Sequence, residues 1–238
     1  MHGPLPQHPE DAGQPIDTVL HPGLQLMQQH LTLSGRKLTL VVPRSIDAVL
    51  DMYIARNQGD RDPYWCRPWP SAIALAQLIL QHPELVKGKR VCDIGCGLGL
   101  AGIAAALSGA KEASISQVSA QHFDWGDPSC QGNYDVALAC DVLYEPYSVE
   151  PVAIITPRLL NHRTGRLLLA DPSHRTKDNR DRFLQLLGGQ PKSAMLLQES
   201  SEVTIRMDEQ DSLVQLQLLR MKQGQETVGL KLSVPCQD

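Results

Sequence analysis

The chain has 238 residues, of which 42% are hydrophobic and 20% are charged, and its formal net charge is −4. This length accommodates one sizeable α/β domain with a terminal appendage. The negative charge provides no electrostatic basis for binding nucleic acid or an anionic membrane. No apolar run approaches the roughly 18 residues that span a bilayer. We therefore expect a monomer without a nucleic-acid or membrane partner.

The first 62 residues are predicted to form a tail and a small extension. Residues 1–20 are polar and proline-rich and lack the apolar core of a secretion signal, which predicts a disordered tail. Within 21–62, apolar and polar residues alternate on both sides of "SGRK", as in a β-hairpin. Residues 45–55 then show helical spacing, with Ser45 suited to cap the helix. The main domain is expected over 63–238.

The six cysteines are scattered along the chain and include no C-x2-C pair. They are Cys66, Cys92, Cys96, Cys130, Cys140 and Cys236. This spacing favours reduced thiols in a cytosol-like compartment over disulfides. It also predicts no metal site, because neither a second cysteine pair nor a nearby histidine completes a ligand set. We expect a cytoplasmic protein, with nucleus and plastid left open.

Short apolar runs alternate with helical segments through the main domain. The predicted strands are 90–94, 116–123, 134–144, 165–171, 202–207 and 212–221, and the predicted helices are 71–81, 99–110, 150–161 and 177–189. Pro157 is expected to interrupt the third of these helices. The alternation predicts an α/β, Rossmann-like, doubly wound and mostly parallel sheet. The last two strands predict an antiparallel finish, and the hairpin and helix form an N-terminal extension.

The stretch "DIGCGLG" (93–99) carries the strongest local pattern. It follows a predicted strand and opens a helix, so its glycines would allow close backbone approach to a ligand at the helix N-terminus. A tight strand–helix turn without a ligand would also use glycine. The spacing is G-x-G-x-G with an acid before it. This favours S-adenosylmethionine, whose amino group and ribose can be held by acids, over a dinucleotide.

Four blocks together resemble a known family. They are "WPSAIALAQLIL", "VCDIGCGLGLAGIAAAL", "HFDWGD" and "CDVLYE". Their order and spacing are similar to those of the seven-β-strand S-adenosylmethionine-dependent methyltransferases, above all methyltransferase family 16, which includes many protein-lysine methyltransferases. The resemblance covers residues 62–238, and "CDVLYE" contains the D-x-x-Y motif of that branch.

The resemblance implies a role for individual residues. The implied cofactor-binding residues are Trp69, Asp93, Gly95, Cys96, Gly97, Gly99, Asp124, Trp125 and Cys140. Asp141 and Tyr144 would be catalytic and would border the channel through which the target nitrogen reaches the methyl group. A carboxylate can position an ammonium, and a tyrosine can accept its N–H groups or face its charge.

Each of these residues also has a structural interpretation. Trp69, like Trp65, could serve packing beside a proline. Asp141 could cap the following helix, and Tyr144 could be an ordinary half-buried side chain. After the strand at 165–171, His174 and Arg175 could touch substrate. The stretch 171–182 is, however, interpreted as a solvated loop and helix face.

The acid expected to bind the ribose is missing from the sequence. Family members place a strand ending in an acid, a helix and a further strand before "FDWGD", which requires about 40 residues at ordinary element lengths. Only 14 residues separate Gly109 from Asp124, and 113–121 contain no acid. A deletion through a skipped exon or gene-model error explains this best. The alternative is a compact variant in which Glu112 replaces the acid.

Three functions follow as hypotheses. The first is a protein N-methyltransferase that uses S-adenosylmethionine and acts on a lysine of an unidentified protein. The second is a catalytically impaired relative, because losing two hydroxyl–carboxylate hydrogen bonds of about 1.5–3 kcal/mol each weakens cofactor affinity by 100-fold or more. The third is a small-molecule N-methyltransferase, since the same core serves both substrate classes.

Overall fold

The computed structural model describes residues 24–59, 62–111, 119–120, 124–127, 129–190, 194–207 and 209–222. The predicted tail at 1–20, Glu112 and most of the predicted strand at 116–123 lie outside these residues. The chain divides into two compact units, 1–68 and 69–238. None of the described helices is long and apolar enough to cross a bilayer.

The first unit contains the predicted hairpin and helix. Strands β1 (Leu26–Leu33) and β2 (Arg36–Pro43) pair antiparallel. Ser34 and Gly35 join them with φ values of 49° and 74°, as in a type I′ turn. Helix α1 (Ile46–Ala55) begins after Ser45, whose Oγ accepts a hydrogen bond from an amide of the first turn. The hairpin and the helix cap predicted from the sequence are therefore confirmed.

A small core of Leu24, Val49 and Cys66 holds this unit together, and Trp65 packs against it. Trp65 lies in the short 3-10 helix η3 (Tyr64–Cys66), which begins after Pro63, and its indole N–H donates a 2.8 Å hydrogen bond to the Tyr53 hydroxyl. This tryptophan serves packing, as its structural interpretation predicted.

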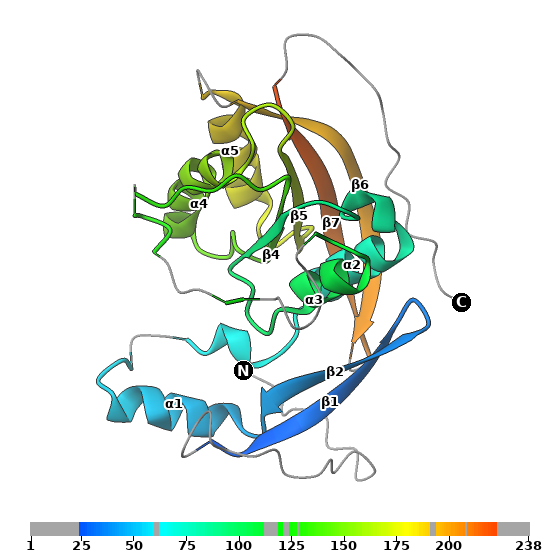
Figure 1. The fold of residues 1–238 in the computed structure, drawn as a ribbon. Helices are drawn as coiled ribbons and strands as arrows, with labels where there is room; N and C mark the ends of the chain where they lie inside the picture. The colour runs from blue at the N-terminus through cyan, green and yellow to red at the C-terminus, as the bar shows by residue number, and fades with distance from the viewer. Residues whose placement is uncertain are drawn as a thin grey trace. The chain divides into compact units, whose positions relative to one another are not determined.

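The second unit is an α/β sheet in the order β3-β4-β5-β7-β6 (Figure 1). Its strands are β3 (Val91–Ile94), β4 (Val136–Cys140), β5 (Arg166–Pro172), β6 (Met195–Met207) and β7 (Gln210–Met221). Strands β3, β4 and β5 run parallel, and β7 pairs antiparallel with both β5 and β6. The predicted fold class is confirmed. Among the described residues, β3 forms one edge and pairs with β4 alone.

Helices cover both faces of this sheet (Figure 1). On one face, α2 (Pro70–Gln81) packs on α3 (Leu100–Leu107) and on β4 to β7, with the short 3-10 helix η4 (Pro83–Leu85) after it. On the other face, α4 (Pro146–Leu159) packs on α5 (Lys177–Gly188). Strand residues point alternately to the two faces. Leu167 and Leu169 therefore join the α4–α5 core, and Leu168 is buried on the α2 side.

The predicted interruption near Pro157 is wrong, because α4 continues through Pro151 and Pro157. Pro157 lacks the N–H that would bond to the carbonyl of Ala153. The side chain of Gln190 donates a 2.8 Å hydrogen bond to that carbonyl instead. Buried residues on both sides of Pro157 also hold the helix against the sheet.

Strand β6 begins at Met195 rather than at the predicted residue 202. The sequence between these points is mostly polar, so it shows no apolar alternation. Strand β6 lies at an edge of the sheet and contains an irregularity at Leu197 and Glu199. An edge strand is held by its backbone hydrogen bonds and needs fewer buried side chains.

Candidate functional site

The glycine-rich turn connects β3 to α3 at the carboxyl end of the sheet. Gly95, Gly97 and Gly99 have φ values of 64°, 53° and 75°, a region that side chains with a Cβ rarely adopt. A Cβ on Gly95 would lie 3.0 Å from both the Trp125 indole and the Val142 side chain. A Cβ on Gly99 would meet no atom within 4 Å. The turn is therefore closed on the Gly95 side and open where α3 begins.

Asp93 caps the helix that follows this turn. Its Oδ2 accepts a 3.0 Å hydrogen bond from the Gly102 amide in the first turn of α3. Burial raises the pKa of Asp93 to about 7, and the hydrogen bond from Gly102 opposes this rise. The strand therefore ends in a carboxyl group that titrates near neutral pH beside the helix N-terminus.

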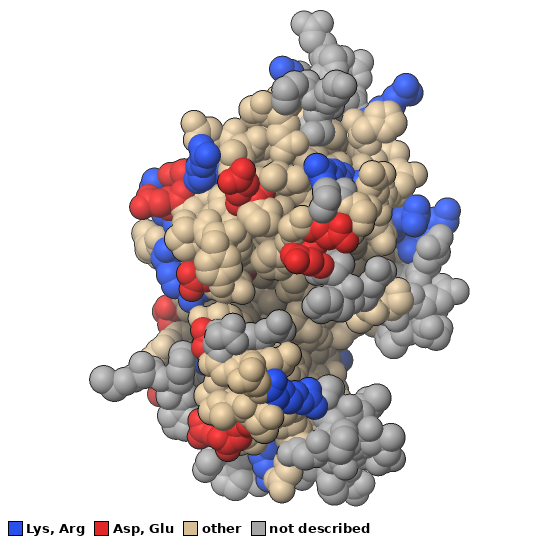
Figure 2. Space-filling model, turned by 90° about the vertical axis from the view of Figure 1, so that its left-hand side faces the viewer, with Lys and Arg blue, Asp and Glu red and all other residues tan. Residues whose placement is uncertain are grey.

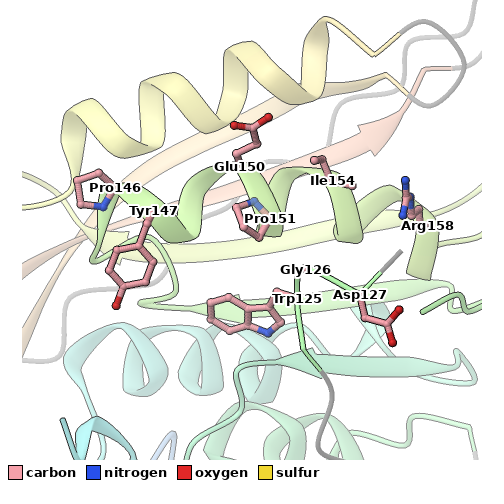
Figure 3. A pocket seen from close by; sticks show the side chains of 9 residues that line it. All are labelled: Trp125, Gly126, Asp127, Pro146, Tyr147, Glu150, Pro151, Ile154 and Arg158. Atoms are coloured by element: carbon pink, nitrogen blue, oxygen red, sulfur yellow. The ribbon is translucent and has the colours of Figure 1, made fainter. Parts of the chain in front are cut away.

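The loop carrying Trp125 lies along α4 (Figure 3). Asp124 is exposed, and its Oδ1 accepts a 2.8 Å hydrogen bond from the Gly126 amide, so this carboxylate stabilises the turn in which it lies. Between the loop and α4 is an open pocket of about 430 Å³. It is lined by Trp125, Gly126, Asp127, Pro146, Tyr147, Glu150, Pro151, Ile154 and Arg158. Sequence reasoning found Trp125 and missed the α4 wall, whose exposed Tyr147 shows no pattern in the sequence.

The face in Figure 2 carries acidic and basic side chains interspersed among uncharged ones. No large patch of one sign appears among the described residues of this face. The described residues in this view form no extended basic surface of the kind that tracks a phosphate backbone.

Asp141 follows β4 in a left-handed conformation, with φ of 54°. Its amide donates a 2.9 Å hydrogen bond to the Ala170 carbonyl on β5. The Asp141 side chain is only 8% exposed, and its Oδ1 lies 2.6 Å from Nη2 of Arg175. Burial raises the pKa of Asp141, and the Arg175 guanidinium opposes this rise. A rare backbone conformation and a buried charge together are typical of a functional position.

The loop between Asp141 and α4 is fixed from two sides. The Ser148 hydroxyl lies 2.8 Å from the Val142 carbonyl and 2.7 Å from the Glu145 carbonyl. The Asn179 side chain donates a 2.7 Å hydrogen bond to the Leu143 carbonyl. Tyr144 sits half-buried in this loop. The D-x-x-Y segment is thus held rigidly at the carboxyl edge of the sheet.

Arg175 turns toward this loop from the segment after β5. Its guanidinium carbon lies 5.7 Å from the centre of the Trp69 ring, within cation–π range. His174 and Arg175 are both exposed, as the interpretation of 171–182 as a solvated loop and helix face predicted, but that interpretation is wrong at Thr176 and Arg180, which are buried. The carboxyl ends of β4 and β5 lie side by side, so a side chain after one strand can reach a side chain after the other.

Asp171 is a second buried carboxyl group that sequence reasoning missed. It is fully buried, and neither of its oxygens makes a hydrogen bond of standard geometry within the described residues. Burial and nearby Asp141 raise the pKa of Asp171 well above its usual value. Its position at the end of the apolar run "LLLAD" could have identified it, because such strand ends form the site edge.

The structure brings the remaining predicted residues to the same edge. Burial raises the pKa of the Cys140 thiol, and Asp93, Asp171 and Asp141 raise it further, so acidic groups surround this residue. Cys96 is exposed on the glycine turn. Among the described residues, no cluster of three His, Cys, Asp or Glu side chains could hold a metal ion.

Two groups of contacts therefore form the candidate site. One joins Gly95, Trp125 and Val142, and the other joins Trp69, Arg175 and Asp141. Val142 directly follows Asp141, so the groups adjoin at the ends of β3 and β4. The site combines a glycine turn open to a ligand with a carboxylate that already holds a cation.

Comparison with known proteins finds methyltransferases. The chain is 34% identical over 105 residues to the electron transfer flavoprotein beta subunit lysine methyltransferase of Rattus norvegicus, covering 44% of this chain and 36% of that protein. It is 53% identical over 50 residues to the Danio rerio protein of the same name, covering 21% and 19%. It is 28% identical over 153 residues to the histone-arginine methyltransferase METTL23 of Xenopus laevis, covering 54% and 59%.

The chain thus matches about a third of the rat protein and less than two thirds of each of these relatives. No family model matches it. A TehB-like SAM-dependent methyltransferase from Corynebacterium glutamicum has a TM-score of 0.46 at 14% identity, covering 74% of this chain and 100% of that one. The curated relatives confirm the resemblance to methyltransferases that the four sequence blocks indicated.

Proposed function

We propose that this protein transfers a methyl group from S-adenosylmethionine to a nitrogen atom of a protein side chain, foremost a lysine. The named activities of the relatives support protein methylation as the class of reaction. The observation that carries the proposal is the Asp141 carboxylate. It is buried beside the glycine turn and binds a cationic side chain, Arg175, against an aromatic ring.

The residues of the glycine turn fit the cofactor's amino-acid end. Gly97 and Gly99 present backbone without side chains, and the space beside Gly99 is open. Asp93 would face the amino group, and Trp125 would lie beside the adenine. When bound, S-adenosylmethionine supplies a methyl group on a positively charged sulfur. The accepting nitrogen must present a lone pair to the carbon of this methyl group.

Asp141 and Tyr144 would prepare the accepting nitrogen. A lysine enters as an ammonium ion, and the Asp141 carboxylate holds it through charge-assisted hydrogen bonds. The Tyr144 hydroxyl offers a further acceptor for its N–H groups. The ammonium loses one proton to water, and the rigid loop then keeps the neutral nitrogen at near-attack distance.

Incubation of the full chain with a cell extract and cofactor labelled in the methyl group tests this proposal. We expect label in protein, and its loss in Asp141→Ala with cofactor affinity near its starting value. Asp181→Ala is the matched control, because Asp181 forms an exposed ion pair with Lys177 on α5. Label only in the low-molecular-weight fraction would favour a small-molecule N-methyltransferase. No transfer by a folded preparation would contradict the proposal.

The sequence itself favours one competing function, a catalytically impaired relative. Residues 113–121 contain no acid that could hold a ribose. Two lost hydroxyl–carboxylate bonds would weaken cofactor affinity by 100-fold or more, at about 1.4 kcal/mol per factor of ten. Calorimetry of cofactor binding separates the two functions. Micromolar binding would eliminate the impaired form, and millimolar binding would support it.

A further inference from the structure

The Arg175 guanidinium occupies the place where the proposed function puts the substrate's cation. Its Nη2 lies 2.6 Å from Asp141 Oδ1, and its carbon lies 5.7 Å from the centre of the Trp69 ring. A carboxylate and an aromatic face are also the groups that bind a cationic side chain from another protein. Arg175 and an incoming cation would therefore compete for the same two partners.

The backbone that carries Arg175 is held in place. Arg180 is buried, and its guanidinium donates hydrogen bonds of 3.0 Å to the Pro172 carbonyl and 2.8 Å to the Ser173 carbonyl. The Ser173 amide donates to Leu213 on β7, and the Thr176 hydroxyl donates to the Pro172 carbonyl. The turn therefore directs Arg175 toward the site, although the Arg175 side chain itself is half exposed.

Of the two partners, Arg175 is the one that can leave. The Arg175 side chain is 52% exposed, whereas that of Asp141 is 8% exposed. Asp141 is fixed by the hydrogen bond from its amide to the Ala170 carbonyl and by the loop that Ser148 and Asn179 hold. The Arg175 side chain can move into water by changing rotamer, but this leaves the buried Asp141 carboxylate without a counter-ion, so the exchange is favourable only when another cation takes its place. Removing the buried carboxylate from its place would disrupt the end of β4.

The Asp141 carboxylate has capacity for a further donor. Within the described residues its Oδ2 is buried and makes no hydrogen bond. The second buried carboxyl group, Asp171, lies close enough to interact electrostatically with Asp141. A buried acceptor without a partner is unfavourable, so an N–H donor arriving at Oδ2 would gain binding energy.

From this geometry we propose that Arg175 is an internal occupant of the substrate's cation site, which limits access to Asp141 until a cationic side chain displaces it. This proposal rests on the proposed function for the identity of the natural ligand. It predicts that removing Arg175 strengthens binding of a cation. If Arg175 instead supported Asp141, its removal would weaken binding.

Small cations test the proposal without cofactor or catalysis. The probes are n-butylguanidinium and n-butylammonium chloride, titrated into the full chain while NMR follows the indole N–H of Trp69, assigned by its loss in Trp69→Phe. The variants are Arg175→Gln, which removes the charge, and Arg175→Lys, which keeps it. Arg182→Gln is the matched control, because Arg182 is an exposed arginine on α5 bonded to Gln185.

We expect Arg175→Gln to bind both probes about 10-fold more tightly, which corresponds to an occupant that leaves the site open for about a tenth of the time. Arg175→Lys should fall between it and the unchanged chain, and Arg182→Gln should match the unchanged chain. Adding Asp141→Asn to Arg175→Gln should remove the gain. Equal or weaker binding by a folded Arg175→Gln would overturn the proposal.

The methyl-transfer assay then separates this proposal from the proposed function. If the chain methylates protein, Arg175→Gln should lower KM for a lysine-containing substrate by a similar factor. If the probes bind as expected and no transfer occurs in any preparation, the occupant is real and the proposed reaction is wrong. Transfer with an unchanged KM and unchanged probe binding would reject the occupant alone.

Discussion

Replacing Gly95 with alanine tests how tightly the glycine turn is packed. Gly95 has φ of 64°, and an added Cβ would lie 3.0 Å from the Trp125 ring and from the Val142 side chain. The left-handed backbone costs a residue with a Cβ about 1 kcal/mol. Overpacking adds about 1–3 kcal/mol, and Val142 is buried and cannot move away easily. We expect Gly95→Ala to lower the free energy of unfolding by about 2–4 kcal/mol in urea titrations.

Gly99→Ala is the matched control for this experiment. Gly99 has φ of 75°, but an added Cβ there would meet no atom within 4 Å. The free energy of unfolding of Gly99→Ala should therefore fall only by the cost of the left-handed backbone, about 1 kcal/mol. Introducing Trp125→Leu into the Gly95→Ala chain should recover part of the unfolding free energy that overpacking removes. Equal losses at the two glycines would refute the reasoning, since they would show that Trp125 and Val142 do not close on the turn.

Three further changes test the site. Burial holds the pKa of Asp93 at about 7, so between pH 4 and 7 the folded chain keeps a proton that the unfolded chain, with a pKa near 3.8, has released. The free energy of unfolding should therefore fall by up to about 4 kcal/mol over this pH range, relative to that of Asp93→Asn. Parallel pH curves for the two proteins would contradict this. Gly97→Val places a β-branched residue at φ of 53°, and calorimetry should show that cofactor binding is abolished; normal binding would mean that the turn is only structural. Ser148→Ala removes the buried hydrogen bond to the Val142 carbonyl and should lower the free energy of unfolding by about 1–2 kcal/mol. Ser45→Ala, which removes an exposed helix cap, is the control and should lower it by about 1 kcal/mol.

Local patterns predicted the elements of the fold because short-range physics decides them. Alternation around "SGRK" predicted the hairpin, and the apolar run at 134–144 predicted a strand buried on both faces, of which only Val136–Cys140 forms β4. The patterns failed where a distant group compensates a local defect. Pro157 should interrupt α4 by its own chemistry, and only the side chain of Gln190, bonded to the carbonyl of Ala153, shows why the helix continues. Strand β6 likewise extends beyond its apolar part because β7 provides backbone partners.

The candidate site was predictable in its position and not in its contacts. Parallel strands place their carboxyl ends at one edge, so Asp141 after β4 and the segment after β5 had to adjoin, and the pairing of Cys140 with Ala170 confirms that register. Which side chain of that segment turns inward depends on the conformation of one turn. Arg180 and Thr176 fix that conformation by bonding to the carbonyls of Pro172 and Ser173. These bonds come from residues that the charge pattern assigns to a solvated helix face. The contact between Arg175 and Asp141, 34 residues apart in the sequence, therefore depends on the conformation of this turn, which composition and spacing do not predict.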